Sequence, residues 1–390
     1  MTLKQKIFSI YEDIFDKCMQ IHKYRVKVRK FEGLAYKSIY SAVELTPQQK
    51  KQIDDFYLKN YGKKIPYIYH QYCMAFTGKF DINYLPEIFY IPALEHFMHY
   101  NGAYTRALAD KNLISLVAAS IGIKTPKTLL SRVSGVFRDE NFHAISRAEF
   151  EREFAELGEV FVKPSLDSSG GHRCAVVCIR NGKDIYSQDS IEKIIDSLGY
   201  DFVIQQRLQC HQALRTLYPH SCNTFRFLTY QWKDRFYHTP LALRIGQGNS
   251  VVDNASSGGM FITVDDDGTM HKTAFTEFNK QYTRHPDTHV VFEKYHIPHI
   301  QKMIDAAIRL HELVPQIGIA HWDFTLSQEG EPVLIEANLR CGGIWLVQLS
   351  HGKGPFGERT AEIIRWIVKM QKIPYSKRKQ YRFGYMEPQK

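Results

Sequence analysis

HWDFTLSQEGEPVLIEAN, residues 321–338, contains two apolar runs on either side of a polar turn, which is the pattern of a β-hairpin. A two-residue turn at 329–330 would place Asp323 directly opposite Glu336. Asn338 follows Glu336 by two residues, so its side chain lies on the same face of the strand. A three-residue loop would instead shift the register and put the two acids on opposite faces.

This predicted hairpin brings two carboxylates and a carboxamide together on one side. Facing carboxylates repel each other and destabilise a pair of strands. A hard divalent cation reverses that effect, because Mg²⁺ takes a few carboxylate oxygens together with substrate phosphates. Asp323, Glu336 and Asn338 are therefore candidate metal ligands, with an ordinary solvated hairpin edge as the alternative.

The composition is typical of a soluble globular protein. The chain has 390 residues, 44% of them hydrophobic and 24% charged, enough for two or three domains. No apolar run approaches the ~20 residues that cross a bilayer, and the N-terminus lacks the apolar region of a signal peptide, so we expect a cytoplasmic protein. The net charge of +10 suits an anionic ligand such as a nucleotide or a phosphorylated sugar, and no nucleic-acid module is present.

Basic residues gather near both ends of the chain, at Lys23, Arg25, Lys27, Arg29 and Lys30 and at Lys377, Arg378, Lys379 and Arg382. They are either solvated charges or a peripheral contact with anionic lipid on the inner face of the membrane. The seven cysteines are odd in number and lack paired spacing, which argues against a disulfide framework or a zinc site.

The order of predicted elements indicates an α+β fold with mostly antiparallel sheets, rather than a Rossmann alternation. The first ~95 residues favour helices, including one that Thr46 caps and Gly62 ends. The aromatic segment 84–100 is expected to be a packed connector. Further helices are predicted at 110–121, 147–156, 190–198, 298–313 and 358–370. Strands are predicted at 128–136, 160–163, 175–179, 202–206, 224–231, 236–245 and 261–264.

A second functional signal lies in FVKPSLDSSGGHRCAVVCI, residues 161–179. A strand delivers Lys163, and a loop with five small residues follows: Ser165, Ser168, Ser169, Gly170 and Gly171. Glycines let backbone N–H groups turn toward a phosphate, and the lysine adds a positive charge beside them. The pattern favours a phosphate-binding loop, with a flexible hairpin tip as the alternative. It lacks the GK[ST] of a Walker A loop.

Two weaker signals follow along the chain. A strand at 203–206 ends in amides, so Gln205 and the adjoining backbone could meet the edge of an adenine ring. Arg226 and Arg244 lie inside apolar strands, where an unpaired guanidinium is costly to bury. Each arginine therefore needs an anion, either a carboxylate of the protein or a phosphate or carboxylate of a ligand.

In this order, the segments resemble the sugar-transfer-associated ATP-grasp family of bacterial surface-polysaccharide clusters. The resemblance runs from roughly Leu45 to Ile364 and includes YLPEIFY, ALADKNL, KPSLDSSGG, SCNTFRFLTY, LRIGQGNSVVDNASSGG, HWDFTLSQEGEPVLIEAN and GPFGERT. It implies the ATP-grasp fold, in which two α+β subdomains clasp ATP between antiparallel sheets, with a helical N-terminal region. The implied divisions are a helical region at 1–100, the two ATP-grasp parts at 101–205 and 206–372, and a basic tail at 373–390.

The resemblance also implies a role for each candidate residue. The implied ATP contacts are Lys111, Lys163, Ser165, Ser168, Ser169, Gly170, Gly171, Gln205, Gln206, Arg207 and Leu208. The implied ligands of Mg²⁺, or of Mn²⁺ as an alternative, are Asp323, Glu336 and Asn338, and the implied catalytic residues are Arg244 and Arg226. ATP-grasp proteins often carry Glu where Gln205 stands in this chain.

The implied activity is ATP- and Mg²⁺-dependent ligation of a carboxylate to an amine. A carboxylate would attack the γ-phosphate of ATP, and an amine would capture the acyl phosphate to give an amide, ADP and phosphate. The small-molecule partners would be sugar or amino-acid derivatives, such as polysaccharide precursors, and no nucleic acid is expected. Two alternatives stay open: a phosphotransferase acting on a sugar-like hydroxyl, and a non-catalytic ATP-binding or scaffold protein.

Overall fold

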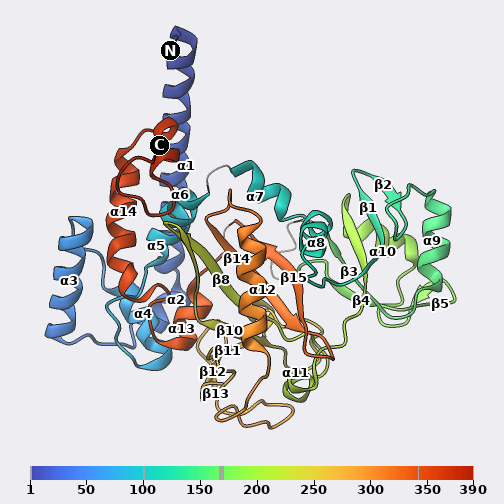
Figure 1. Ribbon diagram of the computed structural model, residues 1–390. Helices are drawn as coiled ribbons and strands as arrows, with labels where there is room; N and C mark the ends of the chain where they lie inside the picture. The colour runs from blue at the N-terminus through green and yellow to red at the C-terminus, as the bar shows by residue number, and fades with distance from the viewer. Residues whose placement is uncertain (1, 100–101, 167–170, 341, 390) are drawn as a thin grey trace.

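The computed structural model describes residues 2–99, 102–166, 171–340 and 342–389 (Figure 1). The described strands form a smaller sheet, a larger sheet and a short pair, β5 (Ile179–Arg180) with β6 (Lys183–Asp184). All the pairings between these strands are antiparallel. The predicted α+β class with antiparallel sheets is therefore confirmed.

The smaller sheet positions one wall of the candidate site. Its strand order is β2 (Val136–Arg138), β1 (Thr128–Val133), β7 (Phe202–Gln206), β3 (Val160–Pro164) and β4 (Ala175–Val177). Val160 and Val162 of β3 join a hydrophobic core with helices α9 (Arg147–Glu156) and α10 (Ile191–Leu198). Because side chains alternate along a strand, Lys163 points to the opposite face, away from that core.

The larger sheet has two covered faces. Its strands run in the order β13 (Gln281–Tyr282), β12 (Ala274–Phe275), β11 (Met260–Val264), β10 (Leu241–Ile245), β8 (Phe225–Trp232), β14 (Ile319–Leu326) and β15 (Pro332–Asn338). Helix α12 (Ile300–Glu312) packs on one face. The N-terminal helices, together with α13 (Trp345–His351) and α14 (Thr360–Lys372), pack on the other.

The strand predicted at 236–245 is interrupted. It consists of β9 (Arg235–His238) and β10, which both pair with β8 along the same edge. Thr239 and Pro240 separate them, because proline has no N–H to donate to the neighbouring strand. The prediction of one continuous strand is therefore wrong at this point.

The N-terminal region is helical, as predicted. Its elements are α1 (Leu3–Glu32), α2 (Leu34–Tyr40), α3 (Pro47–Tyr61), α4 (Ile68–Thr77), α5 (Glu87–Phe89), a π-helix (Tyr90–Glu95), α6 (His96–Met98), α7 (Gly102–Leu108) and α8 (Lys111–Ala119). Helix α3 begins after a capping box at Thr46 and ends at Gly62 with φ +85°, as its sequence predicted. The segment 84–100, expected to be a connector, is mostly helical and buried where described. Among the described residues no helix has both the length and the apolar content needed to cross a membrane.

Strands β14 and β15 form the predicted hairpin, but its turn differs. The loop has three residues, 328–330, and a hydrogen bond of 2.8 Å joins the two residues that flank it. The predicted two-residue turn is therefore wrong, and a regular ladder would have put the acids on opposite faces. An extra residue in β15, Ile335, forms a β-bulge that shifts the register back. As a result, Asp323 pairs with Glu336.

Candidate active site

A cavity of about 1020 Å³ lies between the two sheets and is lined by strands of both. The segment 207–210, which follows β7, crosses from one sheet toward the other along the wall of the cavity. The candidate residues that line this cavity are Lys111, Lys163, Gly171, Gln205, Gln206, Arg207, Leu208, Arg226, Arg244, Asp323, Glu336 and Asn338. Residues from all four sequence signals therefore meet in one place.

Two buried lysines form the basic side of the cavity. Lys111 begins α8 and Lys163 lies near the end of β3, and each is 4% exposed. The Nζ atom of Lys111 lies 3.7 Å from an Oε atom of Glu336 and 3.4 Å from the carbonyl oxygen of Ser165. Burial, and after it the positive charge of Lys111, lowers the pKa of Lys163 to about 8. Two ammonium groups in one buried wall favour the binding of an anion.

The small-residue loop is described only at its ends. The Ser165 N–H donates to the carbonyl oxygen of Asp201 (3.1 Å), while its hydroxyl is buried without a hydrogen-bond partner among the described residues. Gly171 adopts φ +77° and lines the cavity, a conformation that favours glycine. The predicted contacts Ser168, Ser169 and Gly170 lie outside the described residues.

Gln205 offers an unused acceptor at another wall of the cavity. Its Nε2 donates to the carbonyl oxygen of Pro126 and to the hydroxyl of Thr128, both at 3.3 Å. These two bonds orient the amide, and its Oε1 is buried with no partner among the described residues. The exocyclic amino group of adenine is a donor that fits such an acceptor. In the same wall, the Arg207 side chain forms an ion pair with Glu159.

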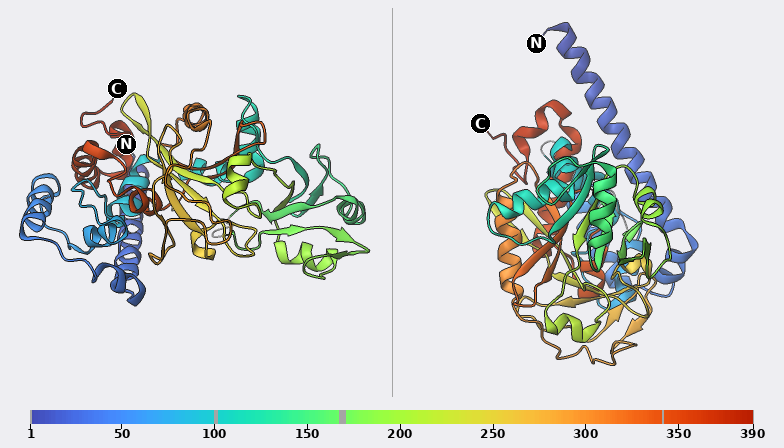
Figure 2. Two further views of the ribbon diagram at one scale, coloured as in Figure 1. Left: turned by 90° about the horizontal axis from the view of Figure 1, so that it is seen from below. Right: turned by 90° about the vertical axis from the view of Figure 1, so that its right-hand side faces the viewer.

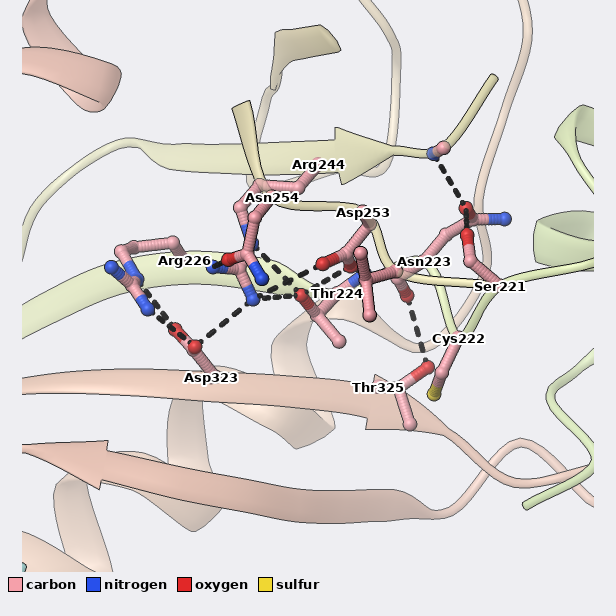
Figure 3. A network of polar contacts seen from close by, with 12 residues as sticks. Ser221, Cys222, Asn223, Thr224, Arg226, Arg244, Asp253, Asn254, Asp323 and Thr325 are labelled. Atoms are coloured by element: carbon pink, nitrogen blue, oxygen red, sulfur yellow. Dashed lines mark hydrogen bonds and ion pairs between the residues drawn. The ribbon is translucent and has the colours of Figure 1, made fainter. Parts of the chain in front are cut away.

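Arg226 and Arg244 converge on Asp323 (Figure 3). Arg226 donates from Nε at 2.6 Å and from Nη2 at 2.5 Å, one bond to each carboxylate oxygen. Arg244 Nη2 lies 3.0 Å from the same carboxylate and also donates to the hydroxyl of Thr224. Burial alone would raise the pKa of Asp323, but the two guanidinium groups hold it well below its usual range. Of the two partners that the sequence left open, the structure shows a protein carboxylate.

The donor set at the hairpin fits a hard divalent cation. An ionised carboxylate has about four acceptor sites, and the arginines use three of those on Asp323. Glu336 is less enclosed, with 24% of its side chain exposed, and accepts a 3.1 Å hydrogen bond from the Asn338 amide. Glu336 and the amide oxygen of Asn338 would therefore supply the open ligands for Mg²⁺, and Asp323 one remaining lone pair.

Sequence reasoning missed three features of this site. Thr224 accepts from Arg244 and donates to Asp253, a buried carboxylate whose pKa burial raises. The sulfur atoms of Cys210 and Cys222 lie 3.0 Å apart in the cavity wall. Tyr90 of the π-helix contacts His321 of β14. These partners are 12 to 231 residues apart in the chain, so no periodic signal marks them.

Comparisons with known proteins agree with the resemblance seen in the sequence. A model of the family described as sugar-transfer associated ATP-grasp matches residues 95–363. No curated protein matches the sequence. Among solved structures, the chain is similar to the VanG D-Ala:D-Ser ligase of Enterococcus faecalis, with 10% identity, a TM-score of 0.39 and coverage of 67% of this chain and 61% of that one.

Two further similar structures have comparable scores. The D-alanyl-alanine synthetase A of Vibrio cholerae shares 14% identity, with a TM-score of 0.39 and coverage of 68% of this chain and 65% of that one. The carboxyaminoimidazole ribonucleotide synthase of Aspergillus clavatus shares 14% identity, with a TM-score of 0.37 and coverage of 63% and 50%. The chain thus spans less than two thirds of each of these three structures. The family match covers more than half of the chain, which therefore belongs to the sugar-transfer associated ATP-grasp family.

Proposed function

We propose that this protein is an ATP- and Mg²⁺-dependent ligase that joins a carboxylate to an amine through an acyl phosphate. One observation carries the proposal: buried Lys111 and Lys163 share a cavity with the carboxylates of Asp323 and Glu336. The two lysines suit the phosphates of ATP, and the two carboxylates suit a metal ion bound to those phosphates. Neither pair alone would favour a nucleoside triphosphate over a simpler anion.

Different side chains would bind different parts of ATP. Lys163 and Lys111 would bind the phosphates, and the free Oε1 of Gln205 would accept from the adenine amino group. When bound to Glu336 and Asn338, Mg²⁺ would neutralise charge on the β- and γ-phosphates. Such a clasp fixes the direction in which the γ-phosphate meets an attacking group.

The reaction needs positioning and positive charge rather than a nucleophilic side chain. A substrate carboxylate oxygen forms a bond to the γ-phosphorus, and the bond to ADP breaks. The amine nitrogen then attacks the acyl carbon, loses a proton and expels phosphate. Arg244 and Arg226 would face the transferring group, because their guanidinium groups line the cavity above Asp323.

The substrate is proposed to be a sugar or a precursor of a surface polysaccharide. The family description links these proteins to sugar transfer. The cavity wall carries further cationic side chains beyond those assigned to ATP, namely Arg106, Arg215 and Arg340. A substrate that brings its own carboxylate or phosphate would suit this surplus of positive charge.

A phosphotransferase that acts on a hydroxyl is the second candidate. It is favoured by Asp253, which lines the cavity as a buried carboxylate with a raised pKa and could take a proton from a hydroxyl. The mass of the product separates the two activities. A phosphotransferase adds a phosphoryl group to one substrate, whereas a ligase joins two substrates with loss of water.

Turnover measurements test the proposed function. Purified protein with Mg-ATP and mixed pools of carboxylates and amines should convert ATP to ADP over many turnovers only when both pools are present, because the amine must capture each acyl phosphate. Lys163→Ala should lose ATP binding, and Glu336→Gln should lose turnover, because each removes a charge that faces the phosphates. Lys183→Ala, at an exposed position on β6, is the matched control and should behave as the wild type. Unchanged turnover in both site variants would refute the assignment.

A further inference from the structure

Helix α1 exposes an apolar face along its N-terminal two thirds. The N-terminal end of the helix extends beyond the rest of the molecule (Figure 2), and Ser9, Asp13 and Asp16 contact the C-terminal segment on its other side. Eight large apolar side chains on it are between 51% and 75% exposed: Leu3, Ile7, Phe8, Ile10, Tyr11, Ile14, Phe15 and Ile21. Soluble proteins rarely leave a patch of this size uncovered, so a partner is expected on this face.

The amphipathic pattern of α1 is the reverse of that of an ordinary surface helix. The side of the helix that contacts the rest of the chain is polar: buried Asp16 binds His96 and Arg378, and Lys27 binds Glu87. A surface helix normally turns its apolar side inward and its charges outward. Here the inward contacts at Asp16 and Lys27 are ionic, and apolar residues join the core only near the C-terminal end of the helix, at Val28 and Phe31. The exposed face is therefore not explained by packing within one chain.

The exposed face has the spacing of a coiled-coil seam. Apolar residues recur at alternating steps of four and three along the helix, at Leu3, Ile7, Ile10, Ile14, Ile21 and Tyr24, with Lys17 in the one polar position of the series. This 3.5-residue period is typical of helices that wind around one another. Every second position of the seam, at 7, 14 and 21, is isoleucine. A β-branched residue at this core position of each heptad is typical of coiled coils with a small number of helices.

We propose that α1 pairs with α1 of a second copy of this chain. Eight side chains, each more than half exposed, offer roughly 800 Å² per chain, about what one partner contributes to a standard interface. The seam, at residues 3–24, is roughly 33 Å long, enough for three heptads. A single lysine in the seam is a device that fixes register and copy number at some loss of affinity.

Charge argues for a protein partner over a lipid surface. Between residues 3 and 21, three lysines balance three acids, so this part of α1 has no net side-chain charge to attract it to anionic lipid. The basic residues Lys23, Arg25, Lys27, Arg29 and Lys30 lie nearer the body of the molecule. The apolar seam itself is thus suited to an identical neutral helix.

Mass measurements on the full chain test the pairing. Sedimentation equilibrium should give a dimer or small oligomer that dissociates on dilution. The double variant Ile10→Lys/Ile14→Lys should be monomeric, with unchanged circular dichroism because neither side chain is buried against the body. Lys17→Ile should tighten association by about tenfold or more. Glu12→Gln, on the side of α1 away from the seam, is the control and should match the wild type.

Two results would overturn the proposal. One is a wild-type chain that stays monomeric at the highest soluble concentration. The other is a mass that Ile10→Lys/Ile14→Lys and Lys17→Ile leave unchanged. Flotation with vesicles of phosphatidylglycerol and phosphatidylcholine identifies the rival partner. A monomeric chain that floats with these vesicles, and loses this property in the double lysine variant, would assign the seam to a lipid surface instead.

Discussion

Lys163 is the residue whose ionisation should control nucleotide binding. Its pKa is lowered to about 8, first by burial and then by Lys111, and phosphate binds its charged form. Below that pH the ammonium is present, and above it the neutral amine loses the attraction. The affinity for Mg-ATP should therefore fall as pH rises from 8 to 10, by up to about tenfold per unit.

Calorimetry across this pH range checks the assignment, with Lys163→Arg as the control. A guanidinium stays charged throughout, so the affinity of that variant should change much less over the same range. An equally steep loss of affinity in both proteins would show that another group is responsible.

Asp323 should matter more to stability than Glu336, although both are predicted metal ligands. Asp323 is fully buried beneath two arginines, and Asp323→Asn would leave two guanidinium groups without their anion. Removing one partner of a buried ion pair costs about 3–5 kcal/mol, so the unfolding free energy in urea should fall by that amount. Glu336→Gln, at a more open position, should cost less than about 1 kcal/mol. Equal losses of unfolding free energy in the two variants would contradict this prediction.

At the scale of elements, the sequence predicted the facing acids but not how the hairpin achieves them. Alternating apolar residues marked both strands, and a polar turn marked their junction. The loop length and the bulge at Ile335 compensate for each other, and neither leaves a periodic trace in the sequence. Short, regular elements such as α9 and β7 were predicted to the residue, because their caps and alternation are local.

The π-helix supplies a contact that no local pattern reveals. Its first residue, Tyr90, places a hydroxyl 2.5 Å from Nε2 of buried His321, on the strand that carries Asp323. Burial lowers the pKa of His321 to about 3, so the imidazole is neutral, and its Nε2 shares one hydrogen bond with the tyrosine hydroxyl. Tyr90→Phe leaves this buried nitrogen without its partner and should lower the unfolding free energy by about 1–3 kcal/mol.

A double-mutant cycle with His321→Leu separates this hydrogen bond from packing. In the His321→Leu background the imidazole partner is gone, so Tyr90→Phe should cost at least about 1 kcal/mol less than it does in the wild type. Urea unfolding of the four proteins gives the comparison. If Tyr90→Phe costs the same free energy in both backgrounds, the hydrogen bond between Tyr90 and His321 does not contribute to stability.

At the scale of the whole molecule, the two ends of the chain are joined to one core. Residues of α3, α4, α14 and the larger sheet share a single hydrophobic cluster, so the helical region is not packed apart from the ATP-grasp sheet. Arg378, which the sequence grouped with solvated or lipid-binding charges, is buried and paired with Asp16 of α1. Sequence patterns could not show this, because the two residues are 362 positions apart.

The ion pairs of Asp16 should make the stability of the protein depend on pH. Burial would raise the pKa of Asp16, but hydrogen bonds and charge from His96 and Arg378 lower it to about 2. A carboxyl with a depressed pKa contributes stability above its unfolded value near 3.8, and that contribution is lost as pH falls toward 2. We expect Asp16→Asn to be about 2 kcal/mol less stable than the wild type at pH 6, with the difference shrinking below pH 4. Urea unfolding at several pH values measures it, and Asp13→Asn, at a partly exposed position one turn away, should show a smaller effect. If the difference in unfolding free energy between Asp16→Asn and the wild type stays constant down to pH 2.5, packing rather than the charge of Asp16 stabilises this contact.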